Sequence, residues 1–287
     1  MSSSDSKSDS ALGSSLNSSG SRPGSVKMVL REFHYQQLLF WRNRVGAVFT
    51  IIFSSVFLIL LSATSAGSHI EFLQGISIAQ YYTPAFMAYG LMAACFNNLA
   101  IATVVRRETG LLKRLRLSPL PGWALLSAVV LNAVAVTAIG AVVVLALGIF
   151  GLGVTLSLSS IIPLVVAMTL GSVCFSALGL AISTVVPNQD AAGPMISIVF
   201  FILLFLSGLW FPLTPGSILA RVSNYFPVRR LILAVVTPFI GHGVSPWDFK
   251  DLFVVIVWGI VGTFIAVRRF RWSPWKDNHS IRSRPSE

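Results

Sequence analysis

The most chemically distinctive segment of the chain is Arg106–Pro121, RRETGLLKRLRLSPLP, which lies between two long apolar stretches. It gathers five basic side chains around a single carboxylate, that of Glu108. Such a cluster of charges is not a catalytic site, but it can orient a membrane protein and bind a partner. A basic loop between two membrane spans is expected to stay on the cytoplasmic side. The segment is therefore either a charge cluster that only orients the chain or a docking element for a partner.

The sequence carries no recognisable catalytic or metal-binding motif. It has no GxxxxGK[ST] nucleotide loop, no HExxH zinc motif and no GxSxG nucleophile turn. Its four histidines are scattered, and Cys95 and Cys174 stand alone in apolar stretches, which favours packing thiols. The apolar stretches hold almost no ionisable side chains, which disfavours an ion-coupled carrier, because such carriers bind their ion through buried ionisable groups. We expect no catalytic residue, no metal ligand and no cofactor bound by this chain.

Composition indicates a membrane protein. Hydrophobic residues make up 54% of the 287 residues and charged residues 11%, which is too little charge to cover a soluble domain of this size. A net charge of +11 could indicate nucleic-acid binding. The basic residues, however, cluster beside apolar stretches, which indicates orientation in a membrane and contact with lipids rather than with nucleic acid.

Six apolar stretches are long enough to cross a bilayer as helices. We therefore predict an all-α polytopic membrane protein with six transmembrane helices. The predicted spans are Val45–Ala66, Tyr81–Val105, Trp123–Phe150, Ile161–Val186, Met195–Phe211 and Leu252–Val267. These stretches are too long and too apolar for the strands of a membrane barrel.

Two polar tails are expected to flank a transmembrane domain over residues 26–271. Residues 1–25 are rich in Ser and Gly and cannot bury enough apolar surface to fold, so we predict a disordered cytoplasmic tail. Residues 272–287 are expected to form a cytoplasmic C-terminal tail. All but four of the 21 basic residues fall in the N-terminal segment, the loop after the second span or the C-terminal tail. This distribution predicts a multi-pass plasma-membrane protein with both termini in the cytoplasm.

Two further segments of the domain are expected to be helical without crossing the membrane. Residues 26–44 have an amphipathic pattern typical of a helix in the membrane interface. Such a helix can be a collar that anchors the first span or an element that relays motion. The outer segment 212–251 contains LILAVVTPFI, residues 231–240, which is too short to cross the bilayer. We expect a re-entrant or interfacial helix there.

The fourth predicted span carries small residues at one-turn spacing, which allow helices to approach each other closely. The pairs are Ser172/Ser176, Ala177/Ala181 and Gly179/Ser183. They can pack either within the chain or across a dimer.

Three motifs in this order resemble the membrane subunit of the type-2 ABC exporter family. The first is RETGLLKRLRLSPL within residues 106–121, similar to an Arg-Glu-x-Gly sequence followed by a leucine-rich basic helix. The second is FLSGLWFP, Phe205–Pro212, at the end of the fifth span, and the third is NYFPVRRL, Asn224–Leu231, before the last span. The resemblance covers about Val26–Arg271 and is greatest to daunorubicin-type and multidrug-resistance efflux permeases.

The resemblance implies a permease subunit of an ATP-driven exporter for a lipophilic substrate, either drug-like or antibiotic-like or a lipid. The chain itself would not be an enzyme, because a separate ATP-binding subunit would bind and hydrolyse ATP. The permease would form a homodimer or pair with a second permease. Export of a lipid-linked polysaccharide and a non-transporting membrane scaffold are the alternative interpretations.

The same resemblance assigns roles to two groups of residues. The expected contacts with the ATP-binding subunit, in a coupling loop over 106–121, are Arg107, Glu108, Gly110, Leu111, Leu112 and Leu115. Their leucines form one face that can enter a groove on a partner. The outer-gate candidates are Ser207, Gly208, Trp210, Phe211 and Pro212. The gate candidates also suit two simpler roles, since proline ends helices and aromatic residues collect at membrane interfaces.

Overall fold

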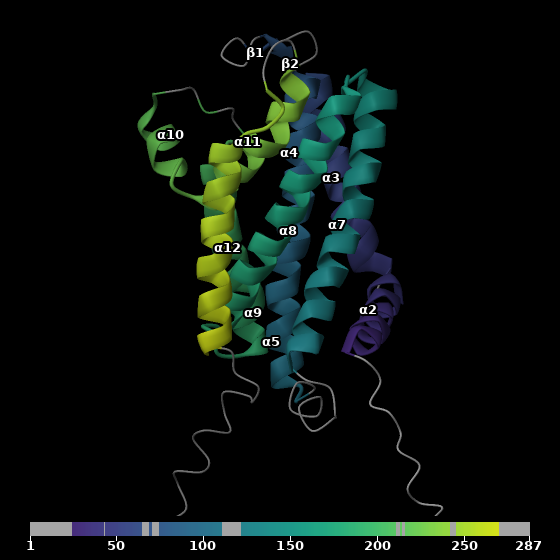
Figure 1. Ribbon diagram of the computed structural model, residues 1–287, viewed down its shortest axis with the longest axis vertical. Coiled ribbons are helices and arrows are strands. Elements are labelled where there is room, and N and C mark those ends of the chain that lie inside the picture. The colour runs from purple at the N-terminus through teal and green to yellow at the C-terminus, as the bar shows by residue number, and fades with distance from the viewer. Residues whose placement is uncertain are drawn as a thin grey trace, which may run out of the picture.

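A computed structural model describes residues 25–42, 44–64, 69–70, 75–110, 122–210, 213, 216–241 and 245–269. The described residues form a bundle of long helices, with a two-stranded hairpin at its upper end in Figure 1. Apart from Ser25, the expected tails over 1–25 and 272–287 lie outside the described residues.

The described chain is almost entirely helical, which confirms the predicted fold class. Its helices are α2 (Ser25–Arg42), α3 (Arg44–Thr64), α4 (Ile78–Met92), η2 (Ala93–Asn98), α5 (Leu99–Glu108), α7 (Gly122–Leu152), η3 (Leu158–Ser160), α8 (Ile161–Ser183), α9 (Gln189–Ser207), α10 (Ile218–Ser223), α11 (Pro227–Ile240) and α12 (Phe249–Arg269). Strands β1 (His69–Ile70) and β2 (Ile76–Ser77) pair antiparallel, a small addition to the all-α prediction.

Five described stretches are long and apolar enough to cross a membrane, and each overlaps a predicted span. They are Ile78–Glu108, Ser127–Leu152, Leu158–Ser183, Gln189–Ser207 and Phe249–Arg269. The remaining predicted span, Val45–Ala66, falls on α3, whose residues Ile52–Thr64 form a shorter apolar helix. The helix expected over 26–44 corresponds to α2.

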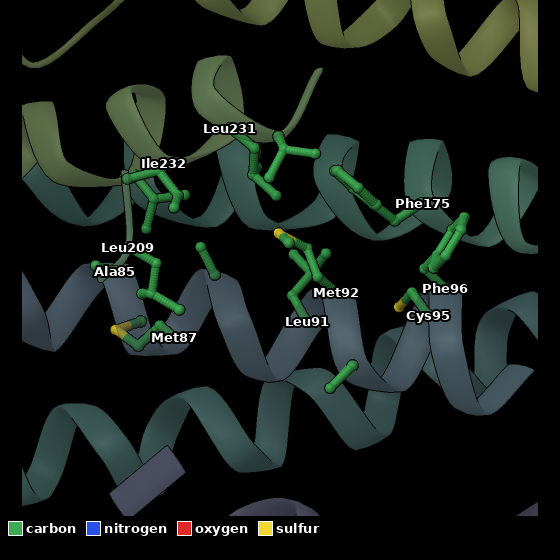
Figure 2. Close-up of a cluster of buried hydrophobic side chains, with 14 of the residues drawn as sticks. Ala85, Met87, Leu91, Met92, Cys95, Phe96, Phe175, Leu209, Leu231 and Ile232 are labelled. Carbon is green, nitrogen blue, oxygen red and sulfur yellow. The ribbon is translucent and has the colours of Figure 1, made fainter. Parts of the chain in front are cut away.

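The second span is a continuous rod made of α4, η2 and α5. Its middle part, η2, is π-helical, a geometry that appears mainly as a short bulge inside α-helices and often at functional sites. The rod is the centre of the bundle, because α3, α7, α8 and α11 all pack against α4. Figure 2 shows Ala85, Leu91 and Met92 of this rod in a buried cluster with Leu231 and Ile232 of α11.

The small residues of α8 pack within the chain, which resolves the open alternative for this stripe. Ser172, Ser176 and Ala177 are buried inside the bundle. At Gly179 the backbone of η2 comes so near that an added Cβ would lie 2.8 Å from the carbonyl oxygen of Cys95. On its other side α8 meets α12, where a Cβ at Gly262 would lie 3.1 Å from the backbone nitrogen of Leu178. A Cβ at Gly179 would therefore force the backbones of α8 and η2 apart, whereas one at Gly262 would be a tight contact that needs a smaller shift.

The helix predicted over 231–240 is part of α11, which has 14 residues and cannot cross a bilayer. Ten of its residues are buried, so α11 faces the interior of the chain on most of its circumference. It packs on α4, α8, α9 and α12 at the upper end of the bundle in Figure 1.

Helix α9 begins six residues before the predicted start at Met195. The predicted start directly follows Pro194, and proline lacks the N–H group that the interior of a helix uses. The structure places Pro194 inside the second turn, where it removes a single backbone hydrogen bond. Asn188 begins the helix instead, since its side-chain Oδ1 accepts a hydrogen bond from the backbone of Ala191 at 2.9 Å. The hydrogen bond at Asn188 thus stabilises the start of the helix more than Pro194 destabilises it.

The close contact between α8 and η2 gives the first prediction. Replacing Gly179 by Ala forces two backbones apart and is expected to destabilise the fold by about 1–3 kcal/mol. The matched control is Gly193→Ala in α9, where an added Cβ meets no atom within 4 Å and alanine favours the helix. Thermal unfolding in detergent, followed by tryptophan fluorescence, should show a lower midpoint for Gly179→Ala only. Equal midpoints would contradict the close approach.

Candidate functional site

The last turn of α5 carries the first candidate residues and lies at the lower end of the bundle in Figure 1. The segment 106–121 therefore begins as helix, and its residues 106–108 are continuous with the second span. Basic residues close α12 at the same end, where the guanidinium of Arg268 lies 4.2 Å from the ring centre of Phe264. We call this end the basic end and the opposite one the α11 end.

Arg107 is buried against the end of α8, with 3% of its surface exposed. Its Nη1 donates to the carbonyl oxygen of Ser183 at 3.2 Å, and its Nη2 donates to that of Val186 at 2.6 Å. Carbonyls at a helix C-terminus lack partners within the helix and carry partial negative charge. The planar guanidinium suits them because it donates two hydrogen bonds in a fixed geometry. Arg107 thus joins α5 to the end of α8.

Glu108 completes this arrangement. Its carboxylate accepts a hydrogen bond from Nε of Arg107 at 3.2 Å and forms an ion pair with it. The side chain of Glu108 is nearly buried. Its negative charge therefore compensates the charge that Arg107 brings into the bundle.

Gly110 ends the helix. The backbone N–H of Thr109 donates to Val105 at 3.0 Å and that of Gly110 to Arg107 at 3.1 Å, which closes the last turn. Gly110 has a φ of 71°, a left-handed conformation that costs glycine little. Leu111, Leu112 and Leu115, the other expected contacts, lie outside the described residues.

Arg106 points to a different neighbour, the N-terminal helix α2. Its Nη2 donates to Oε1 of Gln36 at 2.7 Å, and Nε2 of Gln36 donates to Oε1 of Glu32 at 2.8 Å. Gln36 is buried between the two helices. The last turn of α5 is therefore tied to α2 through Arg106 and to α8 through Arg107. We call these two sets of hydrogen bonds the α5 clamp.

The gate candidates lie at the α11 end, where α9 stops. Gly208 has a φ of 80° and turns the chain out of the helix, and the buried hydroxyl of Ser207 accepts a hydrogen bond from the backbone of Leu209 at 3.0 Å. The ring of Trp210 lies edge-on to Phe57 of α3, with 5.5 Å between ring centres. Phe211 and Pro212 lie outside the described residues.

Two tyrosines of α4 hold the segment that leaves α9. The hydroxyl of Tyr81 donates to the carbonyl oxygen of Gly208 at 2.8 Å, and that of Tyr82 donates to the carbonyl of Trp210 at 3.3 Å. Buried Arg229 of α11 lies beside them, and its Nε donates to Oδ1 of Asn224 at 3.1 Å. The gate candidates are thus tied to the start of the second span.

Sequence reasoning missed Gln36 and the tyrosine pair. Gln36 lies in the amphipathic stretch 26–44, and its two hydrogen-bond partners, Glu32 and Arg106, lie 4 and 70 residues away. Tyr81 and Tyr82 were counted as apolar residues of a span. Buried tyrosine hydroxyls usually find a hydrogen-bond partner, and this general rule is the only signal that could have indicated their role.

A protein-family profile described as ABC-2 type transporter matches residues 31–240, from within α2 to the end of α11. The chain belongs to the ABC-2 type transporter family. The comparison with curated proteins finds no match. As an ABC-2 type membrane subunit, the chain is a multi-pass membrane protein with no ATPase activity of its own. Permeases of this family generally pair with an ATP-binding subunit.

The α5 clamp of this ABC-2 permease gives a second prediction. Arg107→Ala leaves the carbonyls of Ser183 and Val186 without their donor and is expected to cost about 1–3 kcal/mol. Arg107→Lys keeps the charge but not the fork of donors, so it should recover only part of the loss. Thermal unfolding midpoints measure both effects, with exposed Arg269→Ala as the control. Full recovery by lysine would show that charge alone matters at this position.

The tyrosine pair at the other end of the ABC-2 permease gives a third prediction. Tyr81→Phe removes the donor to a buried carbonyl, whereas Tyr82→Phe removes a longer and less buried hydrogen bond. We expect Tyr81→Phe to lower stability by about 1–2 kcal/mol and Tyr82→Phe by less, because unsatisfied buried acceptors are costly. Both substitutions keep the aromatic ring, so the packing is unchanged and only the hydroxyl group is lost. The reverse order of unfolding midpoints would contradict the assignment.

Proposed function

We propose that this chain is the membrane subunit of an ATP-driven exporter that moves a lipophilic substrate, drug-like or antibiotic-like or a lipid, across the plasma membrane. A separate ATP-binding subunit supplies the energy. The proposal is supported by family membership, by the missing nucleotide-binding motif and by spans that hold almost no ionisable residues. Spans of that kind suit an apolar cargo, because a charged one would need buried polar partners.

The observation that carries the proposal is the α5 clamp. A loop that transmits force must be connected to the elements it moves, and residues 106–121 start from a helical turn bonded to two of them. Arg106 connects the turn to α2, and Arg107 connects it to the end of α8. A displacement of the loop by the ATP-binding subunit would then reach α2, α5 and α8 together. In this proposal α2 relays motion as well as anchoring the first span.

Within the loop, the proposed contacts divide into two kinds. Arg107 and Glu108 position the loop from inside the bundle, where their side chains are largely buried. Gly110 lets the chain leave the helix, since its φ of 71° suits glycine. Leu111, Leu112 and Leu115 provide the apolar face that enters a groove on the ATP-binding subunit. Lys113, Arg114 and Arg116 would then lie toward the carbonyl end of a short helix, which basic side chains favour.

The proposed exit lies at the α11 end. Ser207, Gly208, Trp210, Phe211 and Pro212 follow the end of α9, and we propose that this segment swings outward about Gly208. Tyr81 and Tyr82 hold it to α4 when the exit is closed, through their bonds to the carbonyls of Gly208 and Trp210. Opening would break these two bonds.

Charge sets the proposed orientation. The basic end faces the cytoplasm under the positive-inside rule, and so do both termini. One chain supplies half of a two-fold pathway, so we propose a homodimer or pairing with a second permease. The daunorubicin-like resemblance of FLSGLWFP, Phe205–Pro212, favours a drug-like cargo.

The test is co-purification of the intact chain in mild detergent, and it forms the fourth prediction. A P-loop ATPase should co-purify with the unmodified chain. Leu115→Asp should reduce its amount about tenfold or more, because burying a leucine contributes about 1.5–3 kcal/mol and a carboxylate cannot replace it. Inverted vesicles that hold both subunits should accumulate a lipophilic fluorescent amine when ATP is added.

The matched control is Ser159→Asp, which adds the same carboxylate at an exposed position of the α11 end. It should leave both the amount of ATPase and the dye uptake unchanged. The proposal fails if no ATPase co-purifies with the unmodified chain. Equal losses in Leu115→Asp and Ser159→Asp would also remove the loop from the contact.

A further inference from the structure

Gln80, in the first turn of α4, binds the backbone of two distant segments. Its Nε2 donates hydrogen bonds to the carbonyl oxygen of Thr155 at 2.6 Å and to that of Phe239 at 2.9 Å. Its Oε1 accepts a hydrogen bond from the backbone N–H of Thr155 at 3.1 Å. Thr155 lies in the connection 153–157 between α7 and η3, and Phe239 lies in the last turn of α11. One side chain thus joins segments that are 75 and 159 residues away along the chain.

A primary amide suits this set of bonds, because it carries two N–H donors and a carbonyl acceptor in one plane. The carbonyl of Phe239 is among the last four of α11, which have no partner within the helix. The N–H and carbonyl groups of Thr155 lie outside any helix or strand. Gln80 therefore provides partners for three backbone groups that regular structure leaves without one.

The connection that Gln80 holds is also fixed to α7. The backbone N–H of Val154 donates to the carbonyl oxygen of Gly148 at 3.0 Å, and the side chain of Val154 is buried. Gly153, between them, has a φ of 68° and turns the chain out of the helix. Gln80 therefore ties the first turn of α4 to the end of α7 as well as to α11.

The next two residues of α4 bind a different neighbour. Tyr81 and Tyr82 donate to carbonyls of the segment that follows α9. Successive residues of a helix point about 100° apart, so one turn can contact neighbours on several sides. The first turns of α4 thus hold α7 and α11 through Gln80 and the proposed exit segment through the tyrosines.

We propose that Gln80 is a positioning residue for export, which makes the second span, α11 and the connection 153–157 move as one unit. The inference rests on the proposed function and adds which contacts of α4 persist when the exit opens. A displaced second span would carry α11 with it, away from the segment after α9. The bonds of Tyr81 and Tyr82 would break, whereas those of Gln80 would hold.

Packing alone would not make α4 and α11 move together. Their shared surface is apolar, with Leu91 and Met92 of the rod in one cluster with Leu231 and Ile232 of α11. Apolar contact has no preferred direction, so it allows one helix to slide past the other. Hydrogen bonds require particular distances and angles, and those of Gln80 fix the relative position of the two helices.

Gln80 is expected to matter more for movement than for folding. Thr155 is exposed, and the connection 153–157 joins two membrane spans, so it lies where water replaces lipid. Water can take over the hydrogen bonds of exposed groups, which makes their loss inexpensive for the folded state. Removing the amide should therefore loosen the unit without unfolding the chain.

The fifth prediction compares ATP use with export in inverted vesicles that hold both subunits. Gln80→Met removes all three hydrogen bonds and keeps the length of the side chain. Uptake of the lipophilic amine per ATP hydrolysed should fall about fivefold or more, as expected when two coupled sites are separated, while ATP hydrolysis per complex stays unchanged. Ser159→Met adds the same side chain at an exposed position of the α11 end and should change neither. A purely structural role would lower hydrolysis and uptake in equal proportion, and that result would overturn the proposal.

Hydrogen exchange of the intact chain in nanodiscs tests the unit without the ATPase. The amide of Thr155 should exchange about fivefold faster in Gln80→Met, because its acceptor is lost. Gln80→Glu keeps the acceptor and, as a carboxylate, loses both donors, so Thr155 should stay protected while the last turn of α11 exchanges faster. Unchanged exchange in both variants would overturn the proposal, whether or not an ATPase co-purifies. Absence of uptake by the unmodified complex would instead count against the proposed function.

Discussion

The close approach of α8 to its two neighbours is the contact on which the arrangement of this permease depends. Lipid tails are as apolar as leucine, so helices in a bilayer associate through tight packing rather than through a hydrophobic driving force. Gly179 lets α8 reach the backbone of η2, and Gly262 lets α12 reach the backbone of α8. Because α8 is enclosed on both sides, its end is fixed, and the carbonyls of Ser183 and Val186 stand where Arg107 can bind them.

The rod of α4, η2 and α5 connects the two ends of the molecule. At the α11 end, Tyr81 and Tyr82 hold the segment that follows α9. At the basic end, Arg106 and Arg107 hold α2 and α8. The proposed coupling loop and the proposed exit are thus attached to opposite ends of one continuous element. Rigid elements with distinct contacts at each end are a recurring means of transmitting movement in proteins.

Much of this fold could be predicted from the sequence, because the length of an apolar stretch and the thickness of a bilayer impose the helices almost alone. The short helix before the last span followed from the same argument applied to residues 231–240. The early start of α9 could not be predicted in this way, since the side chain of Asn188 begins the helix six residues before Pro194. At the candidate site, Gly110 could be recognised as a helix end. The partners of Arg106 and Arg107 could not be recognised, because Gln36 and Ser183 lie 70 and 76 residues away in opposite directions along the chain.

The π-helical segment η2 also determines the rotational phase of the second span. Hydrogen bonding from residue i to i+5 accommodates one residue more than the α-helical pattern, and each residue turns a helix by about 100°. Everything below η2 is therefore rotated relative to an uninterrupted helix. Arg106 and Arg107, themselves about 100° apart, face α2 and α8 only with this rotation in place. A bulge near the middle of the membrane thus selects which neighbours the arginines at its end can reach.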